Sequence, residues 1–124
     1  MVEFKEVEGY DSLKSELKSL EKSDKPVFVL FTGSKDSSGK SWCPDCVTAD
    51  PVVHASVKEK LSEGVFITCQ VGPRDFWKNQ SNPFRTDSKL KITAVPTLIH
   101  WGQSNRLVEE QLFKRDMVDM LFED

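Results

Sequence analysis

The stretch from Val27 to Cys46, with the sequence VFVLFTGSKDSSGKSWCPDC, decides which fold the chain is predicted to adopt. Its first six residues, 27–32, form a continuous apolar run that is typical of a strand buried on both faces. Its last four residues form a CxxC pair, and Pro44 suits the first position of a helix that begins there. A buried strand that leads into a helix through two cysteines predicts an α/β domain with a chemical site at the junction.

Four further segments predict strands. Residues 2–4 alternate apolar with charged side chains, and residues 65–71 show a similar alternation. Residues 96–101 and 106–110 predict a hairpin. Strands and helices that alternate, followed by a hairpin and a closing helix, predict a central mixed β-sheet flanked by α-helices on both faces. The length fits one compact unit, so we expect residues 1–124 to form a single domain.

Helix signals surround these strands. Asp11 or Ser12 can cap a first helix, whose leucines share one face. The apolar spacing predicts a second helix over residues 44–62, with Pro51 expected to bend it and Gly64 to stop it. The segment between the third strand and the hairpin shows no clear period and is expected to form a short helix and loops.

Composition and charge exclude several classes of protein. The net charge is −3, and lysine and arginine are mixed with acidic residues along the chain, so no footprint for nucleic acid is present. No secretory signal and no apolar run of membrane-spanning length are found, so no membrane association is expected. Three cysteines, two of them three positions apart, indicate a reducing compartment. A monomer is the default expectation.

The CxxC pair predicts thiol chemistry. A thiolate at a helix N-terminus faces unpaired N–H groups and the positive end of the helix dipole, which lower its pKa, so Cys43 is the expected nucleophile. Cys46 lies one turn further, close enough to form a disulfide, and is the expected resolving cysteine. Pro44 is expected to stiffen the turn. Asp45 stabilises the helix N-terminus while its charge opposes ionisation of the thiol, so both residues are expected to tune the redox properties.

Three separated landmarks together resemble the thioredoxin family. They are the WCPDC motif at 42–46, Pro51 eight residues after Cys43, and the Val95-Pro96-Thr97 segment before a late strand. The long insertion that precedes WCPDC more narrowly resembles the small cytosolic thioredoxin-related proteins of the thioredoxin domain-containing protein 17 group. The resemblance implies a thioredoxin fold over nearly the whole chain.

The resemblance also implies an activity. The dithiol would reduce small disulfides such as cystine, oxidised or nitrosylated thiols and selected protein disulfides. It would act in the cytoplasm and would itself be reduced by thioredoxin reductase with electrons from NADPH, without a metal or organic cofactor of its own. Pro96 would be a cis proline that faces the cysteine pair, the backbone of Val95 would pair with an extended substrate segment, and Trp42 would cover the nucleophile.

One position departs from the thioredoxin pattern. Thioredoxins carry a buried aspartate on the strand before the CxxC, which helps to move protons to and from the second cysteine, whereas Leu30 occupies that position here. Proton transfer at Cys46 is then left to Asp45, to water or to the substrate. The extended loop over residues 33–41 is expected to narrow the choice of partner.

Two alternatives to a disulfide reductase stay open from the sequence. The same cysteines can serve a peroxidase, which would pass through a sulfenic acid at Cys43. They can also belong to a non-catalytic binding or zinc module, for which Cys69, His54 and His100 are the available additional ligands, although they form no recognisable metal motif. Cys69 is expected to be a buried, inert thiol, and the two histidines are expected to be surface or packing residues.

Overall fold

The computed structural model describes residues 2–123 and shows a five-stranded sheet in the order β1-β3-β2-β4-β5. Strands β1 and β2 run parallel to β3 on either side of it, whereas β4 runs antiparallel to β2 and β5 antiparallel to β4. The predicted mixed sheet is therefore confirmed. The strands are β1 (Val2–Glu8), β2 (Val27–Thr32), β3 (Gly64–Gln70), β4 (Thr97–His100) and β5 (Arg106–Val108).

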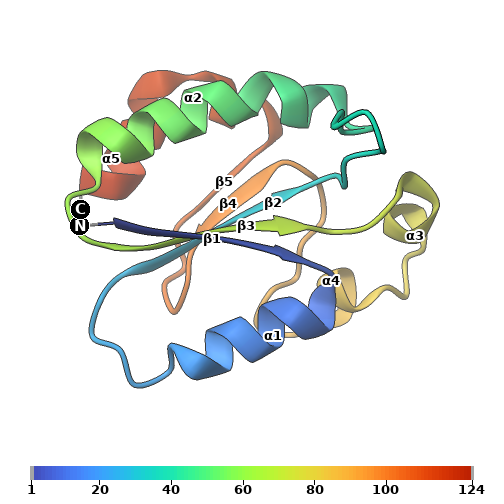
Figure 1. Ribbon diagram of the computed structural model, residues 1–124, viewed down its shortest axis with the longest axis horizontal. Coiled ribbons are helices and arrows are strands. Elements are labelled where there is room, and N and C mark those ends of the chain that lie inside the picture. Colours follow the sequence, from blue (N-terminus) through green and yellow to red (C-terminus); the bar gives the residue numbers. More distant parts are fainter. Residues whose placement is uncertain (1, 124) are drawn as a thin grey trace.

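Helices cover both faces of this sheet (Figure 1). Helices α2 and α5 lie on one face of the sheet, and α1 lies on the other. Helix α4 lies near the N-terminal end of α1. The expected arrangement of helices on both faces is confirmed. No helix among residues 2–123 is both long enough and apolar enough to cross a membrane. The helices are α1 (Tyr10–Ser19), α2 (Pro44–Lys60), α3 (Arg74–Lys78), α4 (Pro83–Thr86), the 3-10 turn η1 (Glu109–Phe113) and α5 (Arg115–Glu123).

Strand β2 separates the two layers of the core. Its residues 27–31 are each no more than 6% exposed, which confirms the predicted strand buried on both faces. Val29 and Phe31 belong to the layer under α1, whereas Phe28 and Leu30 belong to the layer under α2 and α5. Each buried apolar side chain of this size contributes about 1.5–3 kcal/mol relative to an exposed one. The strand that carries the site is thus fixed from both sides.

Helix α1 begins earlier than the sequence suggested. Its N-cap is Gly9 and not Asp11 or Ser12, which both lie in the helix itself. The Gly9 N–H donates to the Gln70 carbonyl oxygen at 2.9 Å, and the Gly9 carbonyl oxygen accepts the N–H of Leu13. Its φ of 90° lets the chain turn from β1 into the helix without a linker, a conformation that glycine adopts without a steric cost.

Helix α2 runs continuously through Pro51 and ends at Lys60, with Leu61 as its C-cap. Gly64 is therefore not the helix stop that the sequence suggested, because it is the first residue of β3. A Cβ atom at Gly64 would lie 2.6 Å from the Pro26 carbonyl oxygen, and its φ is 137°. Glycine is required there because the start of β3 passes directly against the residue before β2.

The segment between β3 and β4 forms two short helices joined by a buried side chain. The Asn82 amide donates to the Trp77 carbonyl oxygen at 2.9 Å, and its side-chain oxygen accepts the N–H of Arg85. Asp87 then ties the segment to α1, because Tyr10 Oη donates to it at 2.5 Å and Lys14 Nζ at 3.2 Å. The segment therefore holds two short helices where one was expected, and the loops that were also expected connect them and follow them.

Candidate active site

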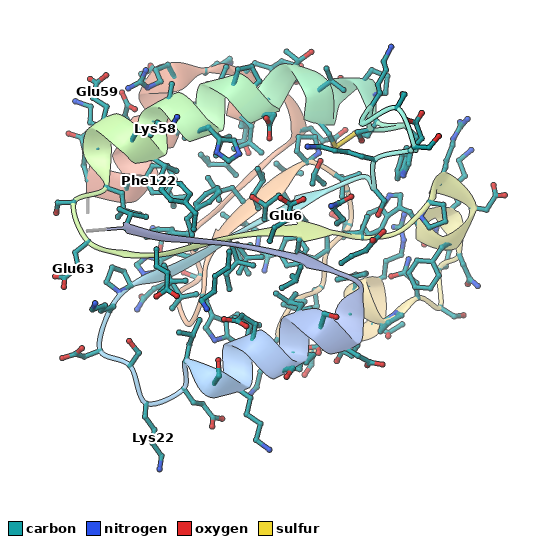
Figure 2. All side chains as sticks on the ribbon, in the orientation of Figure 1. Glu6, Lys22, Lys58, Glu59, Glu63 and Phe122 are labelled. Carbon is teal, nitrogen blue, oxygen red and sulfur yellow. A yellow bond between two sulfur atoms is a disulfide. The ribbon has the colours of Figure 1, made fainter. Side chains whose placement is uncertain are left out.

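The two cysteines of the CxxC pair lie at the start of α2, after the loop that connects it with β2. Cys43 is the N-cap of α2 and Cys46 lies in its first turn. They form a disulfide with a Cα–Cα distance of 5.2 Å, visible in Figure 2 as the yellow bond at the start of α2. Cys43 is 5% and Cys46 3% exposed. The structure therefore brings together the two residues predicted as nucleophile and resolving cysteine.

Backbone N–H groups point at both sulfur atoms. The Cys46 N–H donates to Cys43 Sγ at 3.2 Å, and the Gly33 N–H donates to Cys46 Sγ at 3.4 Å. Ser41 Oγ accepts the Cys43 N–H at 3.2 Å and donates to the Gly33 carbonyl oxygen at 2.8 Å. Donors aimed at a sulfur favour its negatively charged form, so the site can stabilise a thiolate after the disulfide is reduced.

The Val95–Pro96 peptide bond is cis and faces the disulfide. The Val95 carbonyl oxygen lies 3.7 Å from Cys43 Sγ. Val95 comes just before β4, and the antiparallel ladder between β2 and β4 ends at the Phe31–Thr97 pair. The Val95 peptide groups are therefore outside the sheet, next to the sulfur that the sequence predicts as the nucleophile.

An open cleft of about 630 Å³ lies in front of Cys43. Trp42, half-buried, forms part of its wall, and its Nε1 donates to the Gly72 carbonyl oxygen at 2.9 Å. Pro44 and Asp45 line the same cleft together with Val95. Five of the seven residues predicted for the site thus line one cleft; Pro96 joins Val95 through the cis bond and Cys46 lies behind Cys43. Their roles in tuning and substrate binding stay predictions.

The basic side chains of this cleft were not predicted from the sequence. Arg74 and Lys78 extend from α3, and the Arg85 guanidinium stacks over the Trp77 ring at 4.1 Å. Glu109 adds a carboxylate to the same rim. Basic residues at positions 74 and 78, four apart around a tryptophan, were the available signal, since residues four apart share a helix face.

The loop over residues 33–41 is anchored to the site. Asp36 holds the turn of the loop, because its carboxylate accepts hydrogen bonds from the N–H groups of Ser38 and Lys40. The hydrogen bond from the Ser38 side chain lowers the pKa of Asp36 most, and the two backbone hydrogen bonds lower it further. At its start, a Cβ atom on Gly33 would lie 2.7 Å from Trp42 Cε2. The loop therefore packs directly against the aromatic wall of the cleft.

A second cavity of about 520 Å³ lies beside Cys46, under α2. Asp50 and His54 extend into it from α2, and His54 Nε2 lies 3.2 Å from Asp50 Oδ1. The hydrogen bond from His54 lowers the pKa of Asp50. Lys35 and Lys40 of the loop line the cavity, and Glu6 lines it from β1, on the face of the sheet that α2 covers (Figure 2).

The remaining candidate zinc ligands are Cys69 and His100. Cys69 is fully buried in β3, and burial raises the pKa of its thiol to about 12, which fits the expected inert thiol. His100 packs against the Phe28 ring at 4.4 Å, and burial lowers its pKa. Among residues 2–123, no group of three or more histidine, cysteine, aspartate or glutamate side chains is arranged to hold a metal ion.

Comparison with known proteins decides the family. The sequence model described as "Thioredoxin domain-containing protein 17-like, thioredoxin domain" matches residues 6–124. The chain belongs to this family. It is 44% identical to mouse thioredoxin domain-containing protein 17 over 126 aligned positions, covering 100% of this chain and 99% of the mouse protein. It is 52% identical to the human protein over 101 positions, covering 81% and 80% of the two chains.

A plant relative shows a more distant similarity. The chain is 42% identical to the thioredoxin-like protein Clot of Arabidopsis thaliana over 93 positions, covering 73% of this chain and 69% of the plant protein. Membership of the thioredoxin domain-containing protein 17-like family confirms the resemblance stated from the sequence and the thioredoxin fold. It agrees with a redox-active pair at Cys43 and Cys46.

Proposed function

We propose that this protein is a thiol-disulfide oxidoreductase that reduces disulfides with a Cys43/Cys46 dithiol. The observation that carries the proposal is the position of Cys43 Sγ, which accepts the Cys46 N–H, lies beside the Val95 carbonyl oxygen and borders an open cleft. A helix N-terminus favours the thiolate, and the cleft gives a substrate disulfide access to it.

The catalytic cycle follows from the order of the two sulfurs. The Cys43 thiolate attacks one sulfur of the substrate disulfide, the substrate S–S bond breaks, and the first substrate thiolate leaves and takes up a proton. Cys46 then loses its proton and attacks Cys43 Sγ, which releases the second thiol and closes the enzyme disulfide. We propose that thioredoxin reductase returns two electrons from NADPH in the cytoplasm, where such a pair is kept reduced.

The charges around the cleft support a substrate class. Arg74, Lys78 and Arg85 supply positive charge, whereas Asp45 and Glu109 supply negative charge. A small disulfide that carries carboxylates and ammonium groups at both ends, such as cystine, can pair with both kinds of side chain. We therefore propose small amino acid disulfides as substrates, with selected protein disulfides docking at Val95 and Pro96.

The decisive experiment couples the protein to NADPH consumption by thioredoxin reductase, with cystine as substrate. Wild type is compared with Cys43→Ser and Cys46→Ser. Turnover in the wild type that disappears in Cys43→Ser would support the reductase and its nucleophile together. Wild-type protein that consumes no NADPH under these conditions would refute the proposal. Hydrogen peroxide in place of cystine tests the peroxidase alternative in the same assay.

The substrate class has its own test. Lys78→Gln is expected to raise KM for cystine about threefold to fivefold, the effect of losing an exposed ion pair. KM for cystamine, which lacks carboxylates, should not rise. Lys58→Gln, at the far end of α2 in Figure 2, is the matched control for removing one lysine charge. Equal changes for both substrates would contradict carboxylate recognition at Lys78.

A further inference from the structure

The cavity beside Cys46 is separate from the cleft in front of Cys43. Among the described residues, none lines both spaces. Cys46 Sγ accepts the Gly33 N–H at the edge of this cavity, whereas Asp45, the residue before Cys46, lines the cleft at Cys43 instead. A proton that leaves Cys46 into this cavity therefore does not pass the substrate.

Helix α2 presents two titratable side chains to the same cavity. Residues 46, 50 and 54 are spaced by four and so share one face of the helix. Asp50 and His54 line the cavity with Cys46 and are linked by the 3.2 Å contact. The Asp50 side chain is 50% exposed and the His54 side chain 32%, so the pair reaches from the cavity to solvent.

Charged and polar groups face this pair from each neighbouring element. Lys35 and Lys40 contribute positive charge from the loop over residues 33–41, and Thr68 and Gln70 contribute polar groups from β3. Glu6 on β1 is the other carboxylate at the cavity, but its Oε1 accepts a hydrogen bond from Gln70 Nε2 at 2.8 Å. Asp50 is thus the carboxylate one helical turn from Cys46.

Strand β2, which α2 covers, offers no other proton acceptor at the position of Leu30. Leu30, at the position where thioredoxins carry their buried aspartate, is 1% exposed and packs in the apolar layer under α2. Its side chain holds no group that can accept a proton. A cavity of about 520 Å³, lined by Lys35, Lys40 and Glu6 as well as by apolar atoms, has room for water molecules that connect Cys46 with Asp50.

We infer that Asp50 and His54 form the proton-transfer pair for Cys46. This inference rests on the proposed dithiol cycle and assigns its second step. Once the mixed disulfide on Cys43 has formed, the Cys46 thiol gives its proton to the Asp50 carboxylate, directly or through cavity water. The Cys46 thiolate attacks Cys43 Sγ, the bond from Cys43 to the substrate sulfur breaks, and the substrate leaves as a thiolate that takes a proton from solvent. The hydrogen bond from His54 keeps the Asp50 carboxylate ionised and ready to accept the proton, and the half-exposed Asp50 side chain then releases it to solvent.

The test separates the two chemical steps. Reduced protein is mixed in a stopped-flow instrument with dithiobis(nitrobenzoate), an aromatic disulfide that releases a coloured thiolate twice. The first release reports attack by Cys43 and depends on reagent concentration. The second release reports attack by Cys46 and does not depend on reagent concentration. Both rates are measured between about pH 5 and about pH 9 for wild type, Asp50→Asn, Asp50→Glu and His54→Gln. Glu59→Gln, an exposed carboxylate at the far end of α2, is the control.

Asp50→Asn is expected to slow the second release about a hundredfold or more near neutral pH, the lower end of the usual range for losing a general base, and to leave the first release unchanged. Asp50→Glu should restore most of the rate of the second release. His54→Gln should move the pH dependence of the second release to higher pH, because the hydrogen bond from His54 lowers the pKa of Asp50. A second release in Asp50→Asn that matches the wild type at every pH would overturn the inference, as would equal slowing of both releases in Asp50→Asn and Asp50→Glu. Wild-type protein that shows neither release would instead refute the dithiol function itself.

Discussion

Replacing Asp87 with asparagine is expected to destabilise the fold by about 2 kcal/mol at neutral pH. Burial alone would raise the pKa of this carboxyl group, but hydrogen bonds from Tyr10, the Lys89 N–H and Lys14 outweigh burial and lower it from 3.8 to about 2. Each pKa unit corresponds to about 1.36 kcal/mol, which gives the stated loss. The Asp87 side chain is only 9% exposed, so little of this is screened by solvent.

The direction of the pH dependence follows from the lowered pKa. A carboxyl group with a pKa lower in the folded than in the unfolded state contributes its full stability above the unfolded value of 3.8. That contribution is lost as the pH falls toward about 2. The stability difference between wild type and Asp87→Asn should therefore be largest at neutral pH and shrink as the solution is acidified.

Urea unfolding followed by circular dichroism measures this difference. Wild type and Asp87→Asn are compared at neutral pH and at several lower values, with Asp24→Asn as a control at an exposed loop position. A difference below about 0.5 kcal/mol at neutral pH, the usual range for a surface substitution, would refute the reasoning. So would a large difference that does not change with pH, because it would show that the carboxylate charge is not its source.

Three further outcomes are expected. Gly33→Ala should slow cystine-dependent NADPH consumption and lower Tm, because its Cβ would lie 2.7 Å from Trp42 Cε2; unchanged turnover and Tm would contradict this contact. Cys69 should stay unmodified by maleimide at neutral pH in the reduced native protein, since its thiol has a pKa of about 12, and should react in denaturant, as mass spectrometry can show. Gly64→Ala should cost about 1–3 kcal/mol in urea unfolding because its Cβ would meet the Pro26 carbonyl oxygen.

The junction between β2 and α2 could be predicted because its signals are local. The apolar run at 27–32 has no polar residue before its end, which is typical of a strand covered on both faces. Pro44 fixes the start of α2 because proline lacks the N–H that a helix leaves unpaired at that position. Neither feature depends on contacts from distant parts of the chain.

The caps and the cleft depend on distant contacts and were mispredicted or missed. Gly9 caps α1 because its N–H bonds to β3, a partner that local sequence does not show. The position of Arg74 and Lys78 beside the disulfide depends on the buried Asn82 side chain, which holds the short helices together. The periodic spacing of apolar residues in the sequence does not predict such a contact.

One part of the site carried a signal that the sequence analysis did not use. Cys46, Asp50 and His54 follow each other at intervals of four on a helix that the sequence does predict. His54 was expected to be a surface or packing residue because no metal motif surrounds it. The spacing shows a shared helix face, but only the cavity shows that this face is open to water.

The two spaces on either side of the disulfide have separate walls. Selection on residues such as Arg74 and Lys78 can change which disulfide is accepted without altering the surroundings of Cys46. Selection on the opposite wall can adjust how readily the cycle closes while substrate preference stays the same. A protein engineer who wishes to redirect this scaffold to a new disulfide can therefore mutate one wall and keep the other as it is.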